Sequence, residues 1–146
     1  MKLNNNFELI VIDNYSTDET SQIINKSKIN KSEISVLYLD IGPGYYTSLR
    51  IGLAVAQGIC GSLGIPLVPV NGLDALAFAA HTGHRKICTI IDIKRDEYAF
   101  CLYKPVPGGV VKDTEPEVLD AAKLKIKLNE VLFDILLTNR WISDHY

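Results

Sequence analysis

The sequence predicts a mixed α/β fold, and three observations support this prediction. Runs of branched apolar residues alternate with helix-like stretches through the first two thirds of the chain, which is typical of a sheet flanked by helices. Turns that contain glycine or proline separate these runs. The chain has 146 residues, of which 47% are hydrophobic, so it is long enough to bury a core. We therefore expect one domain over residues 1–146.

The first half of the chain is expected to contain three strands and three helices in alternation. Ser16 or Thr17 can cap the first helix, and Asn71 can cap the third. The apolar run over residues 34–40 is typical of a strand buried on both faces. In chain order, the predicted strands are 7–13, 34–40 and 66–70, and the later two helices are 47–62 and 73–81.

In the second half of the chain, the sequence predicts strands over 87–94 and 98–103, joined by the charged corner Arg95-Asp96-Glu97. We interpret this corner as a salt-bridged hairpin turn. Acid–base chemistry by its carboxylates, or a contact of Lys94 and Arg95 with a partner or a nucleic acid, are weaker interpretations. A turn over 105–109, a strand opening at Val110-Val111, a helix over 120–130 and a last strand over 131–137 complete the prediction.

Composition excludes several classes of protein. Fifteen basic and seventeen acidic residues give a net charge of −2, which argues against a strongly basic nucleic-acid binder. The chain has no run of 18 apolar residues and no signal-peptide pattern at its start, so we expect a cytoplasmic protein without membrane contact. The cysteines at 60, 88 and 101 are widely spaced and odd in number, which predicts buried free thiols.

The turn Gly42-Pro43-Gly44-Tyr45-Tyr46 lies between a predicted strand and a predicted helix. Such a turn can direct backbone N–H groups and a helix N-terminus at an anion. A dinucleotide fingerprint would need glycine at position 47, which is threonine, and a Walker loop would need a G-K-[ST] sequence that is absent. Phosphate binding is therefore the weaker interpretation, and a turn that leads into a packed helix is the stronger one.

The helix predicted over 47–62 carries a ridge of small residues. Such a ridge lets a second helix approach closely, and the helix is apolar nearly all round, which predicts that it is buried. Burial inside the domain and burial against a partner both fit. If the ridge is an interface, Gly52→Leu should abolish dimerisation without altering the circular-dichroism spectrum. The ridge residues recur at every fourth position: Ser48, Gly52, Ala56 and Cys60.

Other sites have less support from the sequence. His81 and His84 could share a metal ion, but no cysteine or carboxylate close by completes a ligand set. Ser62 lies in Gly-Ser-Leu-Gly, which is not a nucleophile elbow. A position at the end of a helix explains the two histidines better than metal binding does. A place in a packed helix explains Ser62 better than hydrolysis does.

Four segments in chain order resemble one family. Residues 42–52 read GPGYYTSLRIG, which is similar to the segment G-P-G-S-F-T-G-L-R-I-G of the TsaB family, also called YeaZ. Residues 65–77, 91–98 and 103–109 resemble further segments of that family, and the likeness is strongest over 30–120. Tyr45, Tyr46 and Ser48 depart from the family pattern. The family's first two strands and its distal C-terminal region lack a counterpart, which predicts a truncated or reduced member.

This resemblance implies an actin-like ATPase (ASKHA, RNase H-like) fold, incomplete at both ends. It implies a non-catalytic scaffold subunit of the complex that transfers a threonylcarbamoyl group to N6 of adenosine 37 in tRNA. The expected partners are a TsaD-like catalytic subunit, a TsaE-like ATPase and a second copy, with tRNA reached only through the complex. The alternatives are an ATP-binding actin-like phosphotransferase and a peptidase-like hydrolase.

The resemblance also indicates where the partner would bind. In that family the helix after the glycine turn helps to build the subunit interface. No catalytic residue, cofactor ligand or metal ligand is assigned, and ATP or ADP at the subunit interface stays open. The expected interface residues are Tyr46, Thr47, Ser48, Arg50, Gly52, Ala56 and Cys60.

Overall fold

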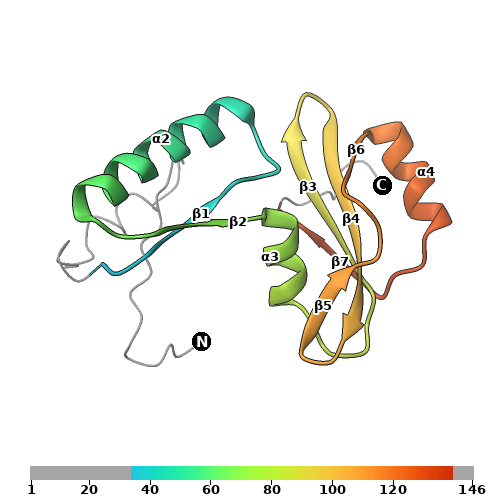
Figure 1. Ribbon diagram of the computed structural model, residues 1–146. Coiled ribbons are helices and arrows are strands. Elements are labelled where there is room, and N and C mark those ends of the chain that lie inside the picture. Colours follow the sequence, from blue (N-terminus) through green and yellow to red (C-terminus); the bar gives the residue numbers. More distant parts are fainter. Residues whose placement is uncertain (1–33, 140–146) are drawn as a thin grey trace, which may run out of the picture. The chain divides into compact units, whose positions relative to one another are not determined.

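The computed structural model describes residues 34–139 (Figure 1). Within these residues the chain forms two compact units, one of residues 34–39 and 47–69 and the other of residues 40–46 and 70–139. The strand predicted at 7–13 and the helix predicted after Ser16 or Thr17 lie outside the described residues. Each unit is described by itself, and the expectation of one domain stays a prediction.

The first unit is built from two short strands and one long helix. Strand β1 (Leu37–Asp40) pairs with strand β2 (Leu67–Val70), and helix α2 (Tyr46–Leu63) connects them in the chain. These elements confirm the predicted order. Only one face of β1 is buried, because Leu37 lies in a small core while Tyr38 is exposed. The prediction that this strand is buried on both faces is therefore wrong, because Tyr38 and Asp40, on the face opposite Leu37, are exposed.

The second unit contains a five-stranded mixed sheet. Strand β3 pairs antiparallel with β4 and parallel with β7, while β5 and β6 both pair antiparallel with β4. This arrangement confirms the predicted mixed sheet. Its elements are α3 (Gly72–Ala79), β3 (Ile87–Lys94), β4 (Glu97–Val106), β5 (Gly109–Lys112), β6 (Glu117–Asp120), α4 (Ala121–Glu130) and β7 (Ile135–Thr138).

Helices α3 and α4 lie on opposite sides of this sheet (Figure 1). Alternate residues of β3 divide between the two sides: Ile87 and Ile91 pack with Leu73 of α3, whereas Cys88 and Ile90 pack with Leu124 of α4. Because both faces are covered, the central strand reads as a continuous apolar run rather than an alternating one. This explains why β3 was readily predicted from the sequence.

Side-chain caps fix the start of both helices of this unit. The Asn71 side chain accepts hydrogen bonds from the backbone nitrogens of Leu73 and Asp74, at 3.0 and 3.3 Å, which confirms the predicted cap. The Asp120 carboxylate accepts from Lys123 N at 2.8 Å at the start of α4. These bonds satisfy N–H groups that a helix leaves unpaired in its first turn.

The charged corner between β3 and β4 has a left-handed backbone. Lys94, Arg95 and Asp96 all have positive φ angles, of 74°, 59° and 60°, and the Asp92 carboxylate accepts from Lys94 N at 2.8 Å. The expectation of a salt-bridged corner stays a prediction.

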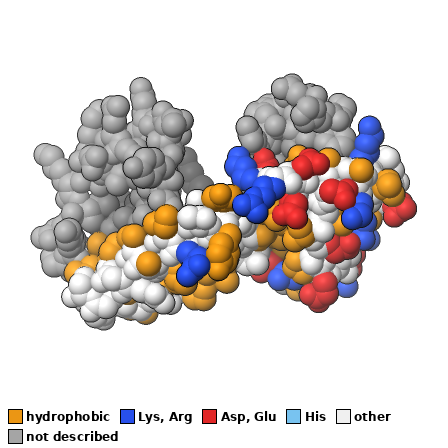
Figure 2. Space-filling model, turned by 90° about the horizontal axis from the view of Figure 1, so that it is seen from above, with side chains coloured by type: hydrophobic (Ala, Val, Ile, Leu, Met, Phe, Trp, Pro, Cys, Tyr) orange, Lys and Arg blue, Asp and Glu red, His pale blue; other side chains and the backbone are white. Residues whose placement is uncertain are grey.

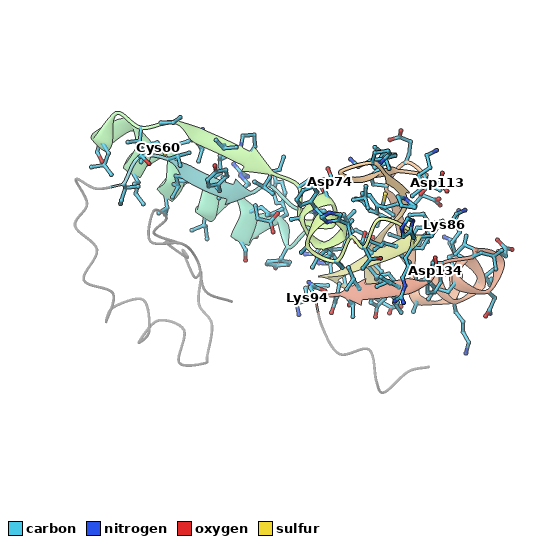
Figure 3. The ribbon with its side chains drawn as sticks, turned by 90° about the horizontal axis from the view of Figure 1, so that it is seen from below. Cys60, Asp74, Lys86, Lys94, Asp113 and Asp134 are labelled. Atoms are coloured by element: carbon cyan, nitrogen blue, oxygen red, sulfur yellow. The ribbon has the colours of Figure 1, made fainter. Side chains whose placement is uncertain are left out.

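Two further differences concern the end of the chain. Strand β6 was not predicted, and β7 begins at Ile135 rather than at residue 131. Val131 and Phe133 pack against the core on the α4 side instead of entering the sheet. Asp134 fixes the start of β7, because it accepts from Lys86 N at 2.7 Å and its own N–H donates to Lys86 O at 2.9 Å (Figure 3).

Candidate functional site

The glycine turn before α2 is fixed by hydrogen bonds inside the second unit. Gly42 has a φ of 100°, a backbone conformation that residues with a Cβ atom rarely adopt. Its N–H donates to an Asp40 carboxylate oxygen at 2.8 Å, and its carbonyl accepts from Gly72 N at 2.8 Å. Ile41 N donates to Val70 O at 2.9 Å. The turn thus joins the end of β1 to the start of α3.

These contacts oppose phosphate binding at Gly42. The N–H group that an anion would use is already bonded to Asp40, and the carboxylate beside it repels a negative charge. A turn that leads into a packed helix fits this geometry better. This agrees with the stronger interpretation of the sequence.

The inner face of α2 forms the core of the first unit. Ala56 is 0% exposed and Cys60 is 8% exposed, and both pack with Leu37 of β1. A Cβ atom built on Gly52 would lie 3.8 Å from a methyl carbon of Leu39. The small-residue ridge therefore lets the helix approach its own strands at these positions. Ala56 and Cys60, predicted as interface residues, are buried in this unit, and their part in an interface stays a prediction.

The outer face of α2 is exposed and largely apolar, as Figure 2 shows along this helix. Ile51 and Val55 are 48% and 44% exposed. Among residues 34–139, no atom lies within 4 Å of a Cβ atom built on Gly58. Helical geometry places these residues side by side on the face opposite Ala56. We define the outer face of α2 as Ile51, Ala54, Val55, Gly58 and Ser62.

This face carries a second row of small residues that the sequence analysis missed. Ala54, Gly58 and Ser62 are spaced by four residues, like the inner ridge, and all three are exposed. The fourfold spacing was visible in the sequence, but spacing alone does not tell which row faces the core. Of the other predicted interface residues, Tyr46, Thr47, Ser48 and Arg50 are exposed, and Gly52 is half-buried.

The residues considered for hydrolysis or metal binding are engaged locally. The Ser62 hydroxyl donates to the Ile59 carbonyl at 2.9 Å. The His81 ring lies 4.9 Å from the Phe78 ring, and its Nδ1 lies 2.6 Å from the Phe78 carbonyl oxygen. Among residues 34–139 no cluster of three or more His, Cys, Asp or Glu side chains could hold a metal ion. No helix in the same range is both long and apolar enough to cross a membrane.

The cysteines are buried free thiols, as predicted. Burial raises the pKa of Cys88 to about 12 and also raises the pKa of Cys101. Burial likewise raises the pKa of Tyr103, whose hydroxyl donates to an Asp74 carboxylate oxygen at 2.6 Å. Since thiolates rather than thiols are nucleophilic, Cys88 and Cys101 are suited to packing and not to catalysis.

Comparison with known proteins identifies the family. The family model described as TsaD, tRNA N6-adenosine threonylcarbamoyltransferase, matches residues 17–130, which is more than half of the chain. The chain belongs to the TsaD family. Proteins named TsaB are also among its relatives, which confirms the TsaB (YeaZ) resemblance of the sequence.

Three relatives illustrate the extent of the match. The TsaB protein of Haemophilus influenzae is 30% identical over 81 residues, which cover 54% of this chain and 34% of the relative. The TsaB protein of Bacillus subtilis is 31% identical over 129 residues, which cover 84% of this chain and 56% of the relative. The tRNA N6-adenosine threonylcarbamoyltransferase of Chlorobium chlorochromatii is 37% identical over 60 residues. These residues cover 41% of this chain and 17% of the relative. The chain thus spans between about a sixth and just over half of the length of these relatives.

Solved structures agree with this family and with the fold. YeaZ from Pseudomonas aeruginosa has a TM-score of 0.54 at 25% identity, and the match covers 68% of this chain and 49% of YeaZ. A protein described as similar to peptidase YEAZ from Pseudomonas aeruginosa has a TM-score of 0.55 at 25% identity. The match covers 68% of this chain and 47% of that protein. Together with the mixed sheet and its flanking helices, these neighbours confirm the predicted actin-like α/β fold class.

Proposed function

We propose that this chain takes part in the biosynthesis of threonylcarbamoyladenosine in tRNA, as a non-catalytic scaffold subunit. Relatives at 30% and 31% identity carry the name tRNA threonylcarbamoyladenosine biosynthesis protein TsaB. The family match to a threonylcarbamoyltransferase supports the same pathway. In this proposal a TsaD-like subunit performs the transfer to adenosine 37, a TsaE-like ATPase joins the complex, and tRNA is bound through the complex.

The outer face of α2 is the observation that carries the scaffold role. The helix buries only its inner face, and Ile51 and Val55 remain about half exposed. The row Ala54, Gly58 and Ser62 beside them has no bulky side chain, so the backbone of a partner helix can approach closely. Burial of such a face on a partner releases water from apolar surface, which favours association. A TsaD-like subunit is the partner proposed for this face.

The residues predicted as an interface divide into two groups in this proposal. Tyr46, Thr47, Ser48 and Arg50 lie in the first turns of α2 and are exposed, so they would extend the contact beyond the outer face. Ala56 and Cys60 would support the interface indirectly, because their packing on β1 holds α2 in position. The side chains of Ser62 and His81 contact backbone carbonyl oxygens three residues earlier in the chain. These contacts support the proposal of a non-catalytic subunit.

Light scattering on the chain, alone and mixed with a TsaD protein from the same source, tests the proposal. We expect a one-to-one complex. Gly58→Leu should prevent it, because a leucine would fill the row that the partner helix approaches, while no described atom lies within 4 Å of a Cβ atom at this position. Ala122→Leu is the matched control, since it also places a leucine at an exposed helical position, on α4. Gly52→Leu is less suitable, because its side chain would extend toward Leu39.

Two outcomes would count against the scaffold role. They are the absence of a complex with a folded chain, and equal loss of binding in Gly58→Leu and Ala122→Leu. Calorimetry of the isolated chain with ATP and magnesium addresses the phosphotransferase alternative. We expect no tight binding, because Asp40 occupies the Gly42 N–H and repels phosphate.

A further inference from the structure

A pocket of about 750 Å³ lies between helix α3 and strand β5, and we name it the α3–β5 pocket. Most of the residues that line it belong to these two elements, and all of them lie in the second unit. Figure 1 shows α3 beside β5 on one side of the five-stranded sheet. Pockets that bind small molecules commonly have volumes of roughly 300–1,000 Å³. The α3–β5 pocket is therefore large enough to hold a small molecule.

The wall of the α3–β5 pocket is mostly apolar. Phe78 and Val111 line it and are 57% and 42% exposed, so they present apolar surface to a ligand. The Phe78 ring has two close neighbours: the His81 ring, with centroids 4.9 Å apart, and the β5 backbone, where a Cβ atom on Gly109 would lie 3.4 Å from Phe78 Cε2. Aromatic rings in proteins pair at centroid distances of about 4.5–7 Å. An exposed ring held in this way therefore suits an aromatic ligand.

Two opposite charges line the same pocket. Lys112 Nζ lies 3.2 Å from Asp74 Oδ1, and the buried Tyr103 hydroxyl donates to the same oxygen at 2.6 Å. Figure 3 shows Asp74 on α3. The side chains of Asp74 and Lys112 are both partly exposed, so a ligand can reach them. Ion pairs with this degree of exposure contribute little stability, and a ligand can therefore separate the two charges at low cost.

We propose that the α3–β5 pocket binds a free α-amino acid with an aromatic side chain. A ligand with only an anionic group is repelled by the Asp74 carboxylate, and one with only a cationic group is repelled by the Lys112 ammonium. An amino acid carries both groups, so its ammonium donates to Asp74 and its carboxylate accepts from Lys112. Its ring packs against Phe78 and Val111, which removes apolar surface from water.

This site uses other residues than the interface of the proposed function. That interface is the outer face of α2 in the first unit, whereas the pocket belongs to the second unit. Gly58→Leu on α2 should therefore leave amino-acid binding unchanged. Failure of either proposal can be recognised without reference to the other.

An NMR titration of the isotope-labelled full chain with L-phenylalanine tests the proposal. We expect saturable shifts of the backbone amides at 74–79 and 109–112, with a Kd of roughly 1 mM or tighter. Lys112→Gln should raise the Kd roughly tenfold, because the ligand carboxylate loses its charged partner. Lys104→Gln is the matched control. Lys104 Nζ also lies 3.2 Å from a carboxylate oxygen, that of Asp113, but neither residue lines the pocket, so the Kd should change less than about twofold.

A ligand series on the wild-type chain keeps the proposal testable if Lys112→Gln does not fold. Phenethylamine lacks the carboxylate and phenylpropionate lacks the ammonium, so each should bind roughly tenfold more weakly than phenylalanine. Alanine lacks the ring and should also bind more weakly. The absence of shifts at the pocket amides would overturn the proposal. Equal weakening by Lys112→Gln and Lys104→Gln, or equal affinity for phenylalanine and for either analogue with a single charge, would also overturn it.

Discussion

At the scale of single residues, two glycines show how the same residue type serves different needs. A Cβ atom on Gly72 would lie 3.1 Å from Ile91 Cδ1 and 3.2 Å from an Asp40 carboxylate oxygen. A Cβ atom on Gly58 would meet nothing within 4 Å. A methyl group at Gly72 would therefore require Ile91 or Asp40 to shift, whereas Gly58 leaves the outer face of α2 smooth. The sequence alone gives no means to tell these roles apart.

Gly72→Ala should lower the free energy of unfolding by roughly 1–3 kcal/mol, because the new methyl group overpacks a site that cannot expand freely. Gly58→Ala, in the interior of a helix, should raise it by about 0.5–1 kcal/mol. Urea denaturation followed by circular dichroism measures both changes. A Gly72→Ala variant as stable as the wild type would show that Asp40 and Ile91 move aside without cost.

At the scale of elements, helix boundaries follow from local chemistry that the sequence displays. Asn71 accepts backbone N–H groups at the start of α3, as its position before an apolar run predicts, and Asp120, expected inside the last helix, instead caps α4. The β3–β4 turn did not follow such a rule, because three consecutive residues other than glycine adopt positive φ angles there. Sheet pairing on both sides of the turn imposes this conformation on residues that disfavour it.

Asn71→Ala should destabilise the chain by about 1 kcal/mol, because two N–H groups in the first turn of α3 lose their acceptor. Asn71→Asp keeps a side-chain acceptor and should remain within a few tenths of a kcal/mol of the wild type. Thermal unfolding followed by circular dichroism compares the two variants. Equal melting temperatures for Asn71→Ala and Asn71→Asp would mean that the cap contributes no stability.

At the scale of the whole molecule, residues 34–139 contribute cores of different size to the two compact units. In this range the core of the first unit contains Leu37, Ala56 and Cys60 with a few half-buried neighbours. The second unit has one core on each face of its five-stranded sheet, and these contain Cys88 and Cys101. Because a smaller core supplies less burial of apolar surface, the first unit should open more easily. Each unit contains a buried cysteine, whose reaction with a thiol reagent reports the opening of that unit.

Thiol labelling in increasing urea at pH 8 should therefore release one cysteine before the other two. Cys60 is expected to react first, because it is 8% exposed in the smaller core, whereas Cys88 and Cys101 are 0% exposed. The raised pKa of Cys88 further slows its reaction in the folded chain. Cys60→Ser should remove the early reaction and leave the later ones. Simultaneous reaction of all three thiols would show that the units open together.

The sequence by itself determined the order of elements from 34 to 139, apart from β6, and the family likeness of the glycine turn. These features depend on local patterns: apolar runs buried on both faces, side-chain caps, and glycines where the backbone must turn. The bounds of α2, β2 and β3 accordingly agree with the prediction to within a residue or two.

Only the tertiary structure decided which face of α2 is buried. Two rows of small residues have the same fourfold spacing, and a helical pattern cannot indicate which of them meets β1 and β2. Contact with Leu37 buries Ala56 and Cys60 and leaves Ile51 and Val55 to solvent. The physical reason is that burial depends on neighbours distant in the chain, whereas spacing reports only the geometry of a single helix.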